Sequence, residues 1–334
     1  MSFVHYRIVL KLLSPLHIGK RKYRNLMETR EYVPGRTLWG ALTARITRDY
    51  FGGDPDYYKK IGDFLIQNFR FGYLWPALKK LEDEKDQNET FEIYFPWGIG
   101  DTNKEEKGKD QTPDHVRLIF KYISPDDFDN LFKFGYMGQP IDYTQNATFE
   151  GGLHEVEYIG PKTRNGDDVY LIGDIWIKDG VIVGNDTSPS IQINSEKRTI
   201  EIKNLINSLQ LGGEKGYGWG RVGFGKFKKA GDSAIGNIGV KDNGEDVILV
   251  FKKGDRLISH LIAENTNNSS TGEHNSGLIV EGEIEPLTGY QFLGSTNWII
   301  PEPPICFVPG SRANAEFKAK VLGDKYGILQ IIKV

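Results

Sequence analysis

The chain has 334 residues, of which 39% are hydrophobic and 12% aromatic, so it can bury one large core or two smaller ones. This is the composition of a soluble globular protein. The net charge of −3 argues, by itself, against a nucleic-acid-binding protein, because such domains usually carry an excess of basic residues.

The cysteine content and the hydropathy pattern predict where the protein is located. Cys306 is the single cysteine, so no internal disulfide can form, and a reducing compartment is the simpler expectation. No stretch approaches the roughly 18 uninterrupted apolar residues of a membrane helix, and charged residues interrupt the apolar N-terminal run. We therefore expect a cytoplasmic protein that does not associate with a membrane.

Basic residues are concentrated at the start of the chain, although the net charge is negative. Residues 1–48 contain ten basic and two acidic side chains, which gives +8 there and −11 in the rest of the chain. The densest run is Lys20-Arg21-Lys22-Tyr23-Arg24. This segment forms either a locally positive surface or an ordinary solvated loop.

The first third of the chain alternates between strand and helix signals. Residues 3–13 predict a strand, and a helix should follow from a Thr37 cap to Tyr50, because apolar residues recur there at helical spacing. Further helices are predicted at 56–69 and near 74–82. Two highly charged segments, residues 82–90 and 101–114, have the composition of exposed insertions.

Strand patterns dominate the remainder of the chain. They occur at 91–94, 116–122, 152–159, 169–177 and 222–227, with one short helical pattern at 200–211, and after residue 235 at 247–251, 277–284, 298–300, 315–321 and 327–334. A polar loop is expected at 264–276. The order predicts an α+β protein with a ferredoxin-like core that carries charged insertions. We expect a first domain at 1–235 and a β-rich C-terminal region, or second module of the same kind, at 236–334.

Two motifs carry chemistry. The helix entry Val33-Pro34-Gly35-Arg36-Thr37-Leu38-Trp39-Gly40 follows the basic run, and free N–H groups at a helix start, beside Arg36 and Thr37, suit a phosphate. A Pro-Gly helix start is also common in proteins without any ligand.

The second motif is the glycine-rich segment 212–221, which combines five glycines with Lys215, Tyr217, Trp219 and Arg221. Glycines allow close backbone approach, aromatic rings can stack on unpaired bases, and cations can contact phosphates. A hairpin with buried aromatic side chains is the structural alternative. The segment lacks the Gly-Lys-Ser/Thr ending of a triphosphate-binding loop and does not follow a first strand, which excludes the common nucleotide-binding motifs.

Three motifs in this order resemble those of the RAMP superfamily of CRISPR-associated proteins. They are Leu13-Ser14-Pro15-Leu16-His17-Ile18-Gly19, the helix entry at 33–42, and Gly216-Tyr217-Gly218-Trp219-Gly220-Arg221-Val222. The resemblance covers roughly residues 1–230. It implies a ferredoxin-like, RRM-related fold and a type III effector subunit whose partners are CRISPR RNA, other effector subunits and target RNA. The residues expected to contact RNA are His17, Lys20, Arg21, Lys22, Arg24, Arg30, Arg36, Thr37, Trp39, Lys215, Tyr217, Trp219 and Arg221.

The resemblance also implies which activity to expect. Subunits of this family that cut target RNA carry an aspartate between the first strand and the first helix, whereas residues 19–34 contain only Glu28 and Glu31 as acids. We therefore expect a binding subunit and no cofactor or metal. A processing or target-cleaving endoribonuclease is the alternative, with His17 as its candidate acid/base, although a structural role for His17 is more common. A β-rich protein with no nucleic-acid role is a third possibility, and salt-sensitive RNA retention would exclude it.

Overall fold

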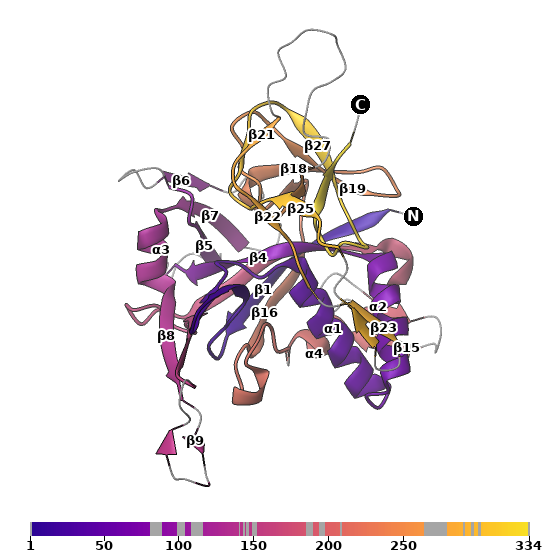
Figure 1. Ribbon diagram of the computed structural model, residues 1–334. Coiled ribbons are helices and arrows are strands. Elements are labelled where there is room, and N and C mark those ends of the chain that lie inside the picture. Colours follow the sequence, from indigo (N-terminus) through magenta and orange to yellow (C-terminus); the bar gives the residue numbers. More distant parts are fainter. Residues whose placement is uncertain are drawn as a thin grey trace.

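The structure is a computed structural model, and Figure 1 shows its layers. It describes residues 2–80, 89–98, 104–107, 116–139, 141–142, 144, 147–148, 152–184, 190–193, 198–207, 209–263, 279–289, 291–294, 297–299 and 302–332. The predicted polar loop at 264–276 lies outside the described residues, as does most of the two charged segments.

A seven-stranded sheet forms the centre of the molecule. Its strands lie in the order β16 (Val222–Lys229), β1 (Phe3–Leu12), β12 (Val169–Lys178), β4 (Phe69–Lys79), β5 (Glu89–Phe95), β7 (Val116–Tyr122) and β6 (Lys104–Lys107). Neighbouring strands are antiparallel except for β5 and β7, which are parallel. β1 and β4 are buried along almost their whole length, as expected when both faces of a sheet are covered.

Helices cover one face of this sheet. They are α1 (Gly35–Tyr50), α2 (Pro55–Asn68) and the short α4 (Ile202–Ile206). Tyr6, Ile8, Leu10 and Leu12 of β1 join the core beneath them, because alternate residues of a strand point to the same face. The chain order β1, α1 and α2, β4, β12, α4, β16 is the β-α-β-β-α-β order of the ferredoxin-like motif. The prediction of an α+β fold is confirmed.

Three local predictions were wrong. The residues predicted as a helix near 74–82 belong to β4, where bulky apolar side chains fill both faces of the sheet and so lose the alternation that marks a strand. Thr37 does not cap α1, because the N-cap is Pro34 and no side chain bonds the free N–H groups. Of the residues predicted as helical at 200–211, only Ile202–Ile206 form a helix, α4, and the two before them belong to the strand Arg198–Glu201.

Smaller elements surround the central sheet. A four-stranded sheet lies in the order β2 (Gly19–Tyr23), β3 (Leu26–Thr29), β11 (His154–Ile159) and β8 (Lys133–Gly138), the last following α3 (Pro125–Phe132). The remaining short strands are β9 (Ile141–Asp142), β10 (Ala147–Thr148), β13 (Ile182–Val183), β14 (Ser190–Ile193) and β15 (Arg198–Glu201). Single 3₁₀ turns lie at Asp179–Val181, Lys215–Tyr217 and Ile235–Asn237.

The C-terminal region forms its own sheet, which Figure 1 shows above the central one. Its eight strands lie in the order β17 (Ser233–Ala234), β18 (Ile238–Asp242), β19 (Val247–Phe251), β27 (Phe317–Val321), β28 (Leu329–Ile331), β20 (Leu261–Ile262), β25 (Ile305–Phe307) and β22 (Ile284–Pro286). Two further pairs are β21 (Val280–Glu281) with β26 (Arg312–Ala313), and β23 (Gln291–Gly294) with β24 (Asn297–Ile299). The division into domains at residue 235 stays a prediction.

Buried charges join the C-terminal region to the second face of the central sheet. Asp174 of β12 is 2% exposed, and its Oδ1 accepts a hydrogen bond from Arg7 Nε at 2.8 Å and lies 3.0 Å from His5 Nε2. Its Oδ2 accepts a bond from the N–H of Ile235 at 2.8 Å, and Arg7 Nη2 donates to the carbonyl of Ser233 at 2.9 Å. One carboxylate therefore links two strands to the start of the C-terminal region.

Glycines permit a second contact between the two parts. A Cβ on Gly35, at the start of α1, would collide with the carbonyl oxygen of Tyr326, and one on Gly327 would collide with the carbonyl oxygen of Phe71. Gly327 also has a φ of +89°, which favours glycine. The loop between β27 and β28 thus packs directly on the beginning of α1.

No helix among the described residues has the length and apolar character required to cross a bilayer.

We predict that Asp174→Asn destabilises the fold by about 3 kcal/mol, because it leaves Arg7 buried without its counter-charge. Burial alone would raise the pKa of Asp174, but Arg7, His5 and the N–H of Ile235 offset this and lower it from 3.8 to about 2. The carboxylate therefore stabilises the native state above about pH 4, and this contribution declines as the pH falls toward about 2. Chemical denaturation from pH 7 to pH 2 should show a smaller acid dependence for the variant than for the wild type, and equal curves would refute the prediction.

Candidate nucleic-acid interface

A groove of about 910 Å³ lies along α1 and collects residues from distant parts of the sequence. Five of the predicted RNA-contacting residues line it, namely Lys20, Arg30, Arg36, Thr37 and Lys215. The C-terminal region contributes residues between Ile262 and Ile328 to the same groove. We call this cavity the α1 groove.

Small residues on α1 give the groove its depth. Gly40, Ala41 and Ala44 line it, and a Cβ added at Gly40 would meet nothing within 4 Å. Residues four apart lie on nearly the same face of a helix, so the small side chains of Gly40 and Ala44 continue the face that begins at Arg36. This face of α1 is therefore open, with the Arg36 cation at its beginning.

The glycine-rich segment packs against the first motif. The N–H of Gly213 donates to the carbonyl of His17 at 2.9 Å, and the N–H of Gly220 donates to the carbonyl of Pro15 at 2.6 Å. Gly212 has a φ of +76°, and a Cβ there would collide with the His17 carbonyl. Close backbone approach at Gly212 explains why glycine is needed there.

Lys215 extends from this segment toward α1. Burial, and then the nearby Arg48, lower the pKa of the Lys215 ammonium group. Arg48 is paired with Asp49, whose Oδ1 lies 3.4 Å from Arg48 Nε, so Lys215 is the cation of this pair that is directed into the groove.

Arg36 is positioned by a residue that the sequence did not single out. Its guanidinium lies 5.1 Å from the centre of the Tyr326 ring, within the range of a cation–π contact. Trp39 also packs against this ring, at 4.4 Å between centroids. Tyr326 has a φ of +53°, which is strained for an aromatic residue. Asp324, Lys325 and Tyr326 all line the groove, and the sequence Gly323-Asp324-Lys325-Tyr326-Gly327 has the same mixture of glycine, cation and aromatic residue as the segment at 212–221.

The two aromatic residues of the glycine-rich segment have different environments. Tyr217 is 77% exposed, whereas the Trp219 ring contacts those of Tyr158 and Tyr136 at centroid distances of 5.0 and 5.8 Å. The segment is not extended here, because Lys215–Tyr217 forms a 3₁₀ turn and Gly218 takes a φ of +80°. Tyr217 alone is open to a ligand.

The other predicted contact residues are more dispersed. His17 is 7% exposed, with Nδ1 2.7 Å from the carbonyl oxygen of Glu157. Trp39 Nε1 donates to the carbonyl of Gly62 at 3.1 Å, which ties α1 to α2. Lys22, Arg24 and Arg221 are exposed and line neither of the two large cavities described here.

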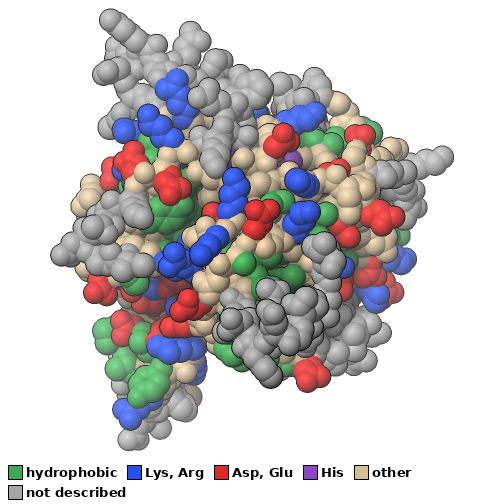
Figure 2. Space-filling model, turned by 90° about the horizontal axis from the view of Figure 1, so that it is seen from above, with side chains coloured by type: hydrophobic (Ala, Val, Ile, Leu, Met, Phe, Trp, Pro, Cys, Tyr) green, Lys and Arg blue, Asp and Glu red, His purple; other side chains and the backbone are tan. Residues whose placement is uncertain are grey.

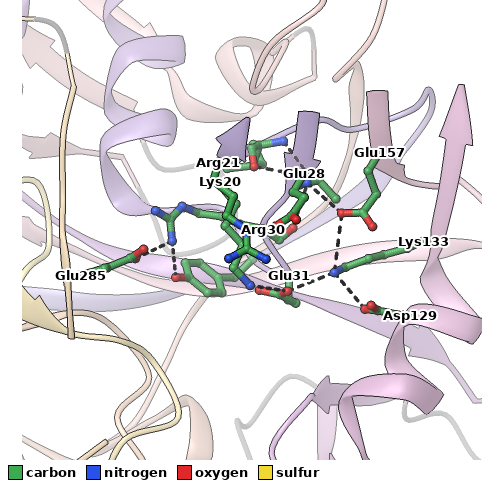
Figure 3. Close-up of polar contacts among 12 residues, drawn as sticks. Lys20, Arg21, Glu28, Arg30, Glu31, Asp129, Lys133, Glu157 and Glu285 are labelled. Carbon is green, nitrogen blue, oxygen red and sulfur yellow. Dashed lines mark hydrogen bonds and ion pairs between the residues drawn. The ribbon is translucent and has the colours of Figure 1, made fainter. Parts of the chain in front are cut away.

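Acidic partners neutralise much of the basic segment, as Figure 3 shows. Lys20 Nζ lies 3.1 Å from Glu31 Oε1, and Arg21 Nε lies 2.6 Å from Glu28 Oε2. Burial would raise the pKa of Glu31, but Lys133 and Lys20 lower it below its ordinary value. The local charge of +8 is therefore not a single positive surface.

Arg30 connects the groove to a buried polar cluster. Its Nη1 donates to Glu285 at 2.6 Å and to the hydroxyl of Tyr32 at 3.0 Å. His260, fully buried, lies 2.6 Å from the same Glu285 oxygen through Nε2 and 2.7 Å from the Tyr73 hydroxyl through Nδ1. Burial chiefly lowers the pKa of His260. Burial would raise the pKa of Glu285, but His260 and Arg30 bring it to about 2.

A second cavity of about 670 Å³ lies beside the first and shares Lys20 and Arg30 with it. It is lined by more acidic than basic side chains. Figure 2 likewise shows Lys and Arg interspersed with Asp and Glu on the face seen from above. Within the described ranges, no group of three or more His, Cys, Asp or Glu side chains is arranged to hold a metal ion.

A family model for the RAMP superfamily matches residues 9–223. The chain belongs to the RAMP superfamily. The match contains all three sequence motifs, the helices α1, α2 and α4 and the strands β4 and β12, together with the end of β1 and the start of β16. It ends before the C-terminal sheet. A comparison with curated proteins finds no match.

Solved structures with similar folds come from CRISPR systems. A chain of a Type III-B Cmr-beta complex bound to cognate target RNA and AMPPnP is 13% identical, with 92% of this chain and 85% of that chain covered and a TM-score of 0.44. A CRISPR protein from Archaeoglobus fulgidus is 12% identical, with 99% of each chain covered and a TM-score of 0.33. Cmr4 from Pyrococcus furiosus is 14% identical, with 69% of this chain and 99% of that chain covered and a TM-score of 0.29. With TM-scores below 0.5, these likenesses assign no role to this chain.

We predict that Trp219→Ala lowers the melting temperature, because it removes a ring that packs on Tyr158 and Tyr136. Tyr217→Ala should leave the melting temperature unchanged, because its side chain is exposed. Thermal denaturation of both variants beside the wild type distinguishes the two environments. An equal loss of stability in both variants, or none in either, would contradict the assignment.

Proposed function

We propose that this RAMP protein is a CRISPR RNA-binding subunit of a type III effector complex, and that it binds guide RNA without cutting it. The single observation that carries the proposal is the α1 groove, where the helix entry, the basic segment and the glycine-rich segment of a RAMP-family chain meet. Two of the similar chains belong to Type III-B Cmr-beta complexes bound to cognate target RNA, which agrees with this proposal.

The groove suits a single strand better than a duplex. Small side chains on α1 allow close approach of a sugar-phosphate backbone, and Arg36 and Lys215 line the groove as candidate phosphate contacts. Lys20 lines it too and is shared with Glu31. Unpaired bases of such a strand remain free to stack, and the exposed ring of Tyr217 is available for this. Guide RNA held in this way would expose its bases to target RNA, the second proposed nucleic-acid partner.

The absence of cleavage is proposed from the acids near the groove. Glu28 and Glu31 are both held in ion pairs, and Glu31 carries a lowered pKa that suits a structural counter-charge more than a proton acceptor. His17 is buried beneath the glycine-rich segment. The subunit would then be one of those that hold the 5′ handle of the guide or lie at an end of the filament, together with other effector subunits. An endoribonuclease of the same superfamily remains the alternative.

We predict that Arg36→Ala weakens binding of single-stranded RNA by roughly tenfold and reduces the slope of log affinity against log salt by about 0.7, the change expected when one phosphate contact is lost. Fluorescence anisotropy at several salt concentrations measures both quantities. Lys253→Ala is the matched control, because Lys253 is exposed and lies outside both cavities.

The control should bind RNA as the wild type does, since its cation does not line the α1 groove. If folded Arg36→Ala protein retained the wild-type affinity and salt slope, the α1 groove would not be the RNA site and the proposed function would fail.

We further predict that Glu28→Gln and His17→Ala leave any RNA cleavage by the assembled complex unchanged. The measurement is cleavage of labelled target RNA by complexes that contain each variant, after equal incorporation has been verified. Loss of cleavage in a correctly assembled complex would favour the endoribonuclease alternative.

A further inference from the structure

The C-terminal region gives the α1 groove a side that differs chemically from α1. Six apolar residues line it there, and we call them the C-terminal wall: Ile262, Leu287, Pro303, Pro304, Ile305 and Ile328. Ile262 and Ile328 are buried, whereas Ile305 is 46% exposed. An exposed apolar side chain is ordinary when it is isolated, but here it continues an apolar surface inside a concave site.

The wall is held rigidly. Its isoleucines lie on or next to three consecutive strands of the eight-stranded sheet, β28, β20 and β25. Beneath them, Ile262, Cys306 and Ile328 form a buried cluster against which Leu287 packs. Its shape is therefore set before any ligand binds, which reduces the entropy lost on binding.

Two carboxylates also face the groove from this region. Glu302 and Asp324 line it and are exposed, and neither forms a salt bridge with any residue that the structure describes. A carboxylate repels a phosphate but accepts hydrogen bonds from the amino groups of nucleobases. These two acids are thus unfavourable beside an RNA backbone and favourable beside the edge of a base.

A nucleotide has the same two-sided chemistry as the groove. Its phosphate matches the cations at Lys20, Arg36 and Lys215, and its base matches an apolar wall bordered by hydrogen-bond acceptors. The groove volume of about 910 Å³ lies within the range of roughly 300 to 1,000 Å³ that is typical of small-molecule sites.

We propose that the C-terminal wall receives an unpaired nucleobase of the bound RNA, and that Glu302 and Asp324 favour a base with an amino group over uracil. This inference rests on the proposed function, because the phosphates of the same strand lie on the α1 side. In this proposal, residues after 235 contact the bound RNA directly.

Three RNA probes test the proposal: short single-stranded oligomers of cytidine, of uridine, and of abasic ribose phosphate. Cytosine and uracil have nearly the same size and differ at C4, which carries an amino group or a carbonyl oxygen, and at N3, which is an acceptor or a donor. Their comparison therefore tests how the two acids interact with this edge of the base. The protein variants are Ile305→Ser and Glu302→Gln. Ile284→Ser is the matched control, since Ile284 is 60% exposed on the neighbouring strand β22 but lines only the second cavity.

We expect the wild type to bind the cytidine oligomer more tightly than the uridine oligomer, and the abasic oligomer most weakly. Ile305→Ser should weaken binding of both base-containing probes by roughly threefold to tenfold, somewhat less than the loss of a full base stack, and leave the abasic probe unaffected. Glu302→Gln should reduce the preference for cytidine, because an amide also donates to uracil. Ile284→Ser should behave as the wild type does.

Equal binding of the abasic and base-containing oligomers by the wild type, or an equal effect of Ile305→Ser on all three probes, would overturn the inference. Tighter binding of uridine than of cytidine would overturn the role of the acids. Failure of the proposed function is recognised separately, because Arg36→Ala would then bind all three probes as the wild type does.

Discussion

The structure depends on the burial of both faces of one sheet. β1 and β12 are apolar on the side of α1 and carry the charged cluster of Arg7, His5 and Asp174 on the other side. A charged group on a buried face is stable only when another element supplies its partners. Ser233 and Ile235, which lead into the C-terminal region, supply them, and that region therefore acts as the second layer of the fold.

This constraint also builds the site. Because the C-terminal region must cover the sheet, its β27–β28 loop reaches the start of α1, where Gly35 allows the two backbones to touch. Gly327 of the same loop allows a similar approach to Phe71 of β4. Tyr326 is then held beside Trp39 and beneath Arg36. The cation expected to contact phosphate is thus positioned by a residue almost three hundred positions later in the chain.

The balance of charge around the groove follows from the same packing. Most basic side chains of residues 1–48 form ion pairs with acids. Some of these acids come from distant segments of the chain: Arg30 pairs with Glu285, and Arg7 pairs with Asp174. Exposed pairs such as Arg21 with Glu28 contribute little to stability, whereas the buried ones fix the relative position of the two layers. A protein with a net negative charge can in this way keep a few cations directed into one groove.

The sequence by itself determined the local features. Apolar periodicity located β1, α1, α2 and β12, and the motifs at 13–19, 33–42 and 216–222 identified the family, because periodicity and glycine placement are properties of neighbouring residues. Local signals failed where burial was two-sided, as in β4, and where a turn replaced an extended segment, as at Lys215–Tyr217. They also failed to predict the partners of the basic residues.

Only the tertiary structure decided that Lys20, Arg36 and Lys215 share one groove, and that the C-terminal wall lines the same groove. It also decided that Trp219 packs on the β8–β11 sheet while Tyr217 is exposed. These are contacts between segments far apart in the chain. Their geometry is set by how two sheets pack, and no single stretch of sequence contains that information.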